Sequence, residues 1–218
     1  MKRWVRSGSL GGLLVIMLGL CGPAQALEPR VQISPGRPHV DVVHEGRKVR
    51  IQRIQDVHNR LLDDDARTSR PCPPACIQPM LAAPGVETVG ELELLDFLAR
   101  DVQAGTGLLL DVRLPELYRL ETVPAALNVP HSVMRADNPH IDRILLALGA
   151  SRTGSIWDFS QARTLTLFAS GPWSDEAVQA VLALRALGYP PTRMRFYRGG
   201  LQAWRMLGLT TVVPGRGT

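Results

Sequence analysis

The sequence predicts an α/β fold in which a parallel sheet carries helices on both faces. From Thr88 onward, short apolar segments of strand character alternate with segments of helical periodicity. Strands that are separated by helices pair in parallel and need cover on both faces. Before Thr88, two β-type segments flank a turn-forming tetrapeptide, which predicts a small hairpin at the start of an irregular extension. A chain of 218 residues has room for one medium-sized domain and such an extension.

The first 26 residues have the three parts of a secretory signal peptide. Basic residues stand at positions 2, 3 and 6, and an apolar run of 11 residues extends from Leu10 to Leu20. Ala24-Gln25-Ala26 then gives the small-x-small pattern that signal peptidase reads. The run is shorter than the roughly 20 apolar residues that span a bilayer. We expect cleavage after Ala26, a periplasmic or secreted protein and no stable membrane span. A retained anchor is the alternative.

Cleavage at that site would leave 22 basic and 20 acidic residues, a net charge of +2. No dense cluster of Lys and Arg with interleaved aromatic residues is present, so nucleic acid is not an expected partner. We predict no cofactor.

Two cysteines, Cys72 and Cys76, would remain in the mature chain. An even pair in an oxidising compartment predicts a disulfide, and closing this small loop stabilises by roughly 2 kcal/mol. A redox-active pair is the alternative. A zinc site with His44 and His58 is a weaker one, because their spacing matches no common zinc pattern.

Residues 27–86 form the predicted N-terminal extension. Val40–His44 and Val49–Ile54 read as strands joined by Glu45-Gly46-Arg47-Lys48. Asp63-Asp64-Asp65 reads as a solvated turn, because the flanking residues offer no regular ligand spacing for a metal. The segment 70–85, rich in proline and containing both cysteines, reads as an irregular strap.

The elements after residue 86 follow from local signals. Thr88-Val89-Gly90-Glu91 predicts a capping box with Thr88 as N-cap, opening a helix that ends near Gly105. The other predicted strands are Leu108–Val112, Ala126–Val129, Thr164–Phe168 and Met194–Tyr197, and the other predicted helices are Pro115–Leu120, Ile141–Leu148, Ser174–Leu187 and Leu201–Leu207.

Three blocks in this order resemble the rhodanese family. The first is L-D-V-R-L-P-E-L-Y at 110–118, followed by V-P-A-A-L-N-V-P at 123–130. The second is the strand, six-residue turn and helix over 165–188, and the third is F-Y-R-G-G-L-Q-A-W at 196–204. The resemblance implies a rhodanese-like domain over residues 87–213, with a tail at 214–218.

In the family the resemblance points to, chemistry depends on the loop between the second block's strand and helix. A cysteine at the first loop position lies among backbone N–H groups at a helix N-terminus, which lowers its pKa and holds an anion or persulfide. The loop here is Ala169-Ser170-Gly171-Pro172-Trp173-Ser174, so the resemblance places Ala169 at the nucleophile position. Ser174 stands where relatives can carry a second cysteine.

The loop and its support give the candidate site. We expect Ala169, Ser170, Gly171, Trp173 and Ser174 to form an anion cradle that lacks a catalytic residue. Serine chemistry at Ser170 lacks a base, since no His lies in the loop, and the acids at 175 and 176 are expected to repel thiosulfate. Asp111, Arg113, Gly199 and Gly200 are expected to be structural, with Arg113→Ala costing about 1 kcal/mol. No metal is predicted.

Two function classes follow from these residues. The first is an exported rhodanese-like module without sulfurtransferase activity, which binds a protein partner or a small sulfur-containing anion. The alternative is a sulfurtransferase or thiol-redox protein that uses Cys72 or Cys76 in place of the missing loop cysteine. This alternative requires the two cysteines to lie close to Ala169 in the fold.

Overall fold

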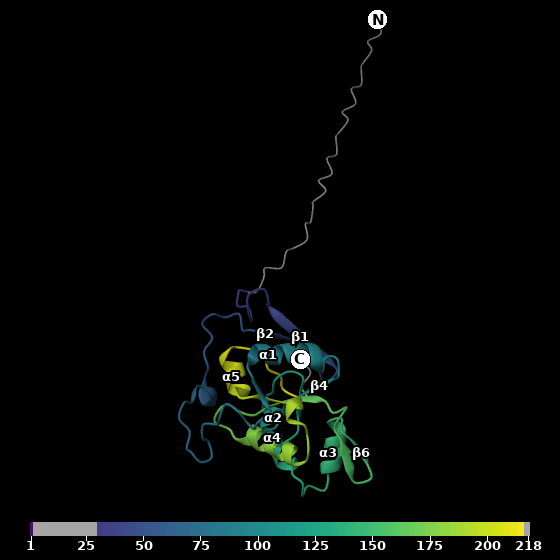
Figure 1. Ribbon diagram of the computed structural model, residues 1–218. Coiled ribbons are helices and arrows are strands. Elements are labelled where there is room, and N and C mark those ends of the chain that lie inside the picture. Colours follow the sequence, from purple (N-terminus) through teal and green to yellow (C-terminus); the bar gives the residue numbers. More distant parts are fainter. Residues whose placement is uncertain (2–29, 216–218) are drawn as a thin grey trace.

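A five-stranded parallel sheet forms the centre of the molecule, as predicted (Figure 1). The computed structural model describes Met1 and residues 30–215, so positions 2–26 of the predicted signal peptide lie outside the described residues. The strand order is β3-β9-β8-β4-β5, and every neighbouring pair is parallel. The strands are β3 (Glu87–Val89), β4 (Gly107–Asp111), β5 (Ala126–Asn128), β8 (Thr164–Phe168) and β9 (Met194–Tyr197).

Helices cover both faces of this sheet, because its strands are apolar on both sides. Adjacent residues of β4 show the division, since Leu110 packs in one hydrophobic cluster and Leu109 in the other. The cluster around Leu110 includes α3 (Ile141–Ala147) and α4 (Glu176–Ala186). The cluster around Leu109 includes α1 (Glu91–Phe97), the π-helical turn η2 (Leu98–Val102) and α5 (Gly200–Met206). The short α2 (Pro115–Leu120) follows β4 and buries none of its side chains.

The predicted N-terminal hairpin is confirmed. It pairs β1 (His39–His44) with β2 (Arg47–Gln52) in antiparallel register, with His44 opposite Arg47. The turn is therefore Glu45-Gly46, shorter than the predicted tetrapeptide, and Gly46 takes the positive φ of 77° that such a turn favours. Apolar side chains of the hairpin join the core with α1 and α5, which anchors the extension on that face.

One local prediction was wrong, and one element was not predicted. Thr88 lies in β3, where its hydroxyl donates to the carbonyl oxygen of Met80, and α1 begins at Glu91 with Gly90 as N-cap. The side chain of Glu93 accepts from Gly90 N at 3.1 Å, so the half of a capping box that the Glu supplies lies two residues further along, and Gly90 has no side chain to supply the other half. A second antiparallel hairpin, β6 (Ser151–Thr153) with β7 (Ile156–Asp158), was not predicted. Its strands are exposed and lack the alternation of apolar residues that marks a strand.

The buried His44 links the extension to the central domain and makes this contact sensitive to pH. Its Nδ1 accepts the backbone N–H of Ala125 at 3.2 Å, while its Nε2 is buried without a partner among the described residues. Burial lowers the pKa of His44 from 6.5. The unfolded chain therefore binds a proton near pH 6.5 that the folded chain resists, and stability is lost as the pH falls below that value.

We expect the melting temperature to fall more steeply below pH 6.5 in the wild type than in His44→Asn. Asparagine keeps an acceptor for Ala125 N but does not titrate. Thermal melts followed by circular dichroism between pH 5 and pH 8 measure the difference between the two proteins. Parallel curves for both proteins would show that His44 is not the titrating group.

Within residues 30–215, no helix is long and apolar enough to cross a membrane.

Candidate functional site

The loop between β8 and α4 is held by the N-terminus of α5. The carbonyl oxygen of Ala169 accepts Leu201 N at 3.0 Å, and that of Ser170 accepts Gln202 N at 2.9 Å. Inside the loop, Ser174 N donates to the carbonyl oxygen of Gly171 at 3.0 Å. The first loop carbonyls thus cap α5, which fixes the loop at the carboxyl end of the sheet, where α/β proteins carry their sites.

The two glycines of the third sequence block allow this close approach. Gly200 has φ of 60°, and a Cβ there would lie 2.7 Å from Gly171 N. A Cβ on Gly199 would lie 2.8 Å from the Cβ of Ala203. A larger residue at 200 would be strained and would push the loop away from α5.

Several backbone N–H groups of the loop take no part in the hydrogen bonds that hold it. Those of Ser170, Gly171 and Trp173 donate to no group that the structure describes. The Trp173 indole is fixed separately, because its Nε1 donates to Gln202 Oε1 at 2.8 Å. Unpaired N–H groups in a loop that leads into a helix can bind an anion. Pro172 contributes no donor. Three of the five residues predicted for the cradle, Ser170, Gly171 and Trp173, therefore carry an N–H group without a described acceptor. Ala169, at the start of the loop, is only 3% exposed.

Below the loop, Asp111 and Arg113 form a buried ion pair. Arg113 Nη2 lies 2.6 Å from Asp111 Oδ2 and Arg113 Nε lies 2.9 Å from Asp111 Oδ1, and the two side chains are 5% and 0% exposed. Thr122 Oγ1 donates to Asp111 Oδ2 at 2.7 Å, and Arg113 Nη2 also donates to the carbonyl oxygen of Glu121 at 2.6 Å. Val112 N donates to the carbonyl oxygen of Phe168, which joins this segment to the start of the loop. The pair itself holds the segment after β4 against residues 121 and 122.

The acids that follow the loop face in different directions. Asp175 is partly exposed and accepts Gln179 Nε2 at 2.6 Å. Glu176 instead lies half-buried, accepts Ser174 Oγ at 2.9 Å and stands 3.9 Å from His131 Nδ1. Burial raises the pKa of the Glu176 carboxyl. The sequence offered no His within the loop and led us to expect that both acids repel thiosulfate, because nothing in it places residue 131 beside Glu176.

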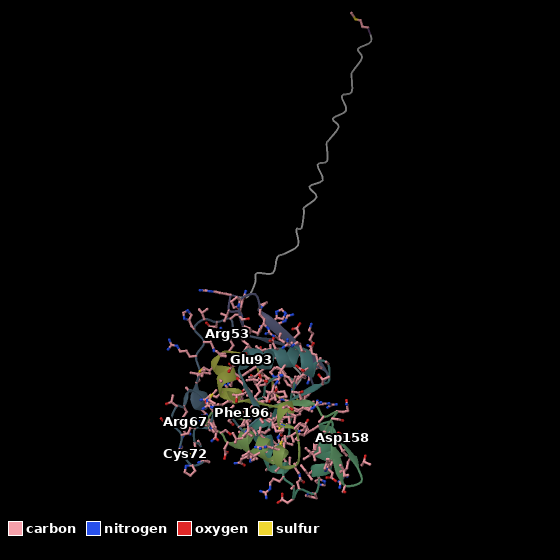
Figure 2. All side chains as sticks on the ribbon, in the orientation of Figure 1. Arg53, Arg67, Cys72, Glu93, Asp158 and Phe196 are labelled. Carbon is pink, nitrogen blue, oxygen red and sulfur yellow. A yellow bond between two sulfur atoms is a disulfide. The ribbon has the colours of Figure 1, made fainter. Side chains whose placement is uncertain are left out.

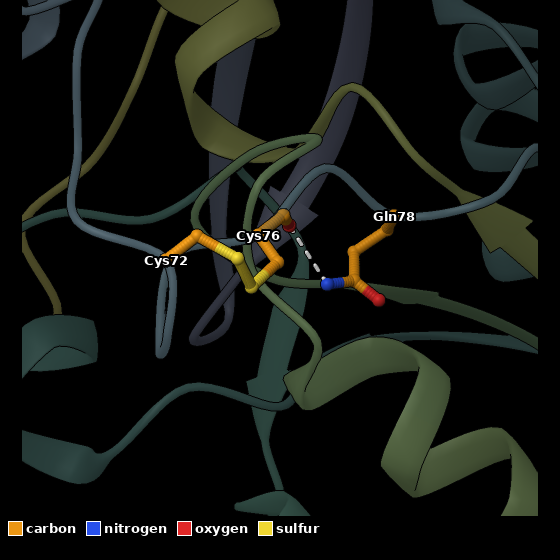
Figure 3. The surroundings of a disulfide bond; sticks show 3 residues. All are labelled: Cys72, Cys76 and Gln78. Carbon is orange, nitrogen blue, oxygen red and sulfur yellow. Dashed lines mark hydrogen bonds between the residues drawn. A yellow bond between two sulfur atoms is a disulfide. The ribbon is translucent and has the colours of Figure 1, made fainter.

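The strap that carries the cysteines lies directly against the loop. Cys72 and Cys76 form the predicted disulfide, with their Cα atoms 4.7 Å apart (Figure 3). Gln78 Nε2 donates to the carbonyl oxygen of Cys76 at 2.8 Å, and Gln78 N donates to that of Pro172 at 2.9 Å. On the other side of the disulfide, the Arg70 guanidinium lies 4.1 Å from the centre of the Trp173 ring. Both flanks of the disulfide therefore contact the loop.

Cys72 is exposed and Cys76 is partly buried. In Figure 2, Cys72 lies on one side of the molecule and Asp158 of β7 on the other, so the second hairpin is far from this site. Sequence reasoning left the position of the strap open, and it missed Gln78, Arg70 and Gln202 as contacts of the loop.

A cavity of about 660 Å³ opens between the loop and the extension. Ser170 and Trp173 line it from the loop, and the buried Arg113 lines it from beneath. The remaining lining residues come from α2 and the residue after it, from α5 and the segment that follows, and from positions 54–70 of the extension. The extension thus forms one wall of the candidate site.

Among the residues that the structure describes, no group of three or more His, Cys, Asp and Glu side chains could hold a metal ion. The residues of the alternative zinc site are used otherwise, because Cys72 and Cys76 are joined in a disulfide and His44 Nδ1 accepts Ala125 N.

The chain matches a known domain family and is similar to solved structures. The model of the rhodanese-like domain matches residues 94–207, just over half of the 218 residues. The human single-domain sulfurtransferase TSTD1 is 26% identical with a TM-score of 0.39, over 55% of this chain and 96% of that one. The rhodanese-like domain of an Anabaena protein is 22% identical with a TM-score of 0.40, over 60% of this chain and 83% of that one. Among curated proteins, no match was found.

Proposed function

Because the chain belongs to the rhodanese-like domain family, we propose that it is a rhodanese-like binding module that does not transfer sulfur through its loop. The observation that carries this proposal is the identity of the loop residues. None of the positions 169–174 is a cysteine, and Ala169 stands at the start of the loop, where the nucleophile belongs. The methyl group of alanine can neither attack sulfur nor carry a persulfide.

The surroundings of the loop support retained anion binding. The N–H groups of Ser170, Gly171 and Trp173 have no described acceptor, and Ser170 and Trp173 line a cavity that Arg70 and Arg113 also line. Glu176 is turned toward Ser174 and His131, so its carboxylate repels an incoming anion less than an outward-facing acid. A small sulfur-containing anion is the simplest ligand of such a site.

The position of the disulfide favours a second candidate function. Gln78, two residues after Cys76, donates its backbone N–H to Pro172 of the loop. A thiol released by reduction of the disulfide would therefore lie near the place where the loop lacks one. In this second function, an external dithiol reduces Cys72–Cys76 and is itself oxidised to its disulfide. The exposed Cys72 thiolate then attacks the outer sulfur of thiosulfate, which forms a persulfide and releases sulfite.

The mass of the protein after incubation with thiosulfate distinguishes the two functions. We expect no added sulfur on the wild type, whether or not a dithiol is added, because the loop has no thiol. The second function instead predicts one added sulfur atom after reduction, located on the peptide that contains Cys72 and absent in Cys72→Ser. That result would replace the first function with the second.

We further propose that the protein is exported, on the basis of its first 26 residues and its single disulfide. Protein recovered from the periplasm or medium should begin at Leu27 and carry the Cys72–Cys76 bond. Intact-mass measurement should then show the loss of residues 1–26 and of two hydrogen atoms. Two thiols that react with an alkylating agent before reduction would contradict the disulfide in the exported form.

A further inference from the structure

We propose that the cavity between the extension and the loop binds an organic anion that has an apolar body. This inference rests on the proposed binding function and specifies its ligand. The cavity's volume of about 660 Å³ lies within the usual range for small-molecule sites and exceeds what an inorganic anion needs.

The charged lining of the cavity favours an anion. Four arginines line it, and three of them are paired with a carboxylate: Arg70 with Asp64, Arg113 with Asp111 and Arg205 with Glu121. Arg60 forms no ion pair or hydrogen bond with a described residue, so its guanidinium is available to a ligand. Arg70 is held by the exposed Asp64 and by the Trp173 ring, yet its Nε is buried with no partner among the described residues. A buried donor without an acceptor is costly unless a ligand satisfies it.

Apolar side chains line the same cavity. Leu62 and Leu120 are each 70% exposed, and Ile54 is 47% exposed. Leu62 and Ile54 come from the extension, while Leu120 comes from the end of α2. In Figure 1 the extension's short helical turn η1 (Asp63–Ala66) lies beside α5, so this wall of the cavity faces the central domain. An apolar body of about eight carbon atoms can cover these side chains and recover free energy from their burial.

The combination of arginines and apolar side chains disfavours ligands that are only anionic or only apolar. Thiosulfate can contact the arginines but leaves the leucines exposed, whereas a neutral alcohol covers the leucines and leaves Arg60 and Arg70 Nε without an acceptor. An alkyl sulfonate does both, and its three oxygens can accept from two arginines at once. The extension, which supplies Arg60, Arg70 and Leu62, therefore determines the ligand class.

Calorimetric titration of the purified protein tests this assignment, with octane-1-sulfonate as the probe. We expect it to bind at least about tenfold more tightly than octan-1-ol or thiosulfate, because only the sulfonate uses both kinds of lining. Octyltrimethylammonium should bind more weakly than octan-1-ol. Comparable affinity for octanol would indicate a purely apolar groove, and comparable affinity for thiosulfate would indicate a site for inorganic anions. Either result, or no binding of the sulfonate, would overturn the proposal.

Two variants locate the site. Arg60→Gln should weaken octane-1-sulfonate binding about three- to tenfold and leave octanol binding unchanged. Leu120→Ser should weaken the binding of both octyl compounds several-fold and leave that of thiosulfate unchanged. Arg119→Gln is the matched control, because Arg119 is an exposed arginine of α2 outside the cavity lining. Full affinity in Arg60→Gln with an unchanged melting temperature would place the sulfonate elsewhere.

The same preparation should also be assayed for sulfur transfer. Sulfur transfer together with sulfonate binding would refute the proposed function and leave the cavity's ligand class intact. If the protein neither transfers sulfur nor binds the sulfonate, the ligand class is refuted and the proposed function stands.

Discussion

Arg113→Ala should lower the melting temperature by roughly 10 °C or more, which corresponds to a loss of about 3–5 kcal/mol. The substitution leaves the carboxylate of Asp111 fully buried without its cation, and it removes the donor to the carbonyl oxygen of Glu121. The sequence alone led to an expectation of about 1 kcal/mol, which suits a charge-assisted hydrogen bond at a sheet edge. That value is too small for the structure, because neither side chain is more than 5% exposed. Thermal melts measure the change.

Two companion variants separate the buried charge from other effects. Arg119→Ala removes a guanidinium from an exposed pair with Glu116, and it should change stability by no more than about 0.5 kcal/mol. Asp111→Asn combined with Arg113→Met should be more stable than Arg113→Ala, because no charge stays buried and asparagine can still accept from Thr122. An Arg113→Ala protein as stable as Arg119→Ala would show that the pair does not brace the fold.

Ala169→Cys should introduce a thiol whose pKa lies below the free value of about 8.5. The unpaired N–H groups of Ser170, Gly171 and Trp173 and the N-terminus of α4 stabilise its thiolate. The burial of position 169 acts in the opposite direction, and we expect the donors to prevail because a thiolate there could accept more than one N–H group. The rate of alkylation against pH measures this pKa, with the disulfide left oxidised so that only the new thiol reacts.

Two further variants test the electrostatic basis of that shift. Adding Glu176→Gln should lower the pKa of the introduced thiol again, because a nearby carboxylate is lost while the Ser174 hydroxyl keeps an acceptor. Glutamine suits this position because the side chain at 176 is half-buried and an uncharged amide can stay there. Ser170→Cys provides the control thiol, because residue 170 lines the cavity and does not stand at the nucleophile position. An Ala169→Cys thiol that titrates at or above 8.5 would mean that the loop is a structural turn without a cradle.

The sequence alone predicted those elements whose structure a local pattern determines. The alternation of strand and helix after residue 86 predicted the parallel sheet, and the turn at Gly46 predicted the hairpin. Thr88 was assigned to a helix cap because Thr-x-x-Glu fits that motif, but the helix begins after Gly90, whose N–H donates to Glu93. The three residues of β3 are too short for periodicity to identify as a strand.

The site depends on contacts between distant segments, which a single sequence does not encode visibly. The strap reaches the loop through one backbone hydrogen bond from Gln78 and one stacking contact from Arg70, and neither leaves a motif. His131 approaches Glu176 only because the segment after β5 and the start of α4 meet below the loop. The cavity likewise arises from the way the extension folds back across α5.

Sulfur transfer from thiosulfate to cyanide by the purified wild-type protein tests the central claim most directly. We predict a rate equal to that of the blank without protein, since no residue from 169 to 174 can carry a persulfide. Ala169→Cys, assayed in parallel, should exceed the blank and so show that the assay detects a restored loop. A wild-type rate above the blank, under conditions that leave the Cys72–Cys76 disulfide intact, would contradict a loop that binds without transferring sulfur.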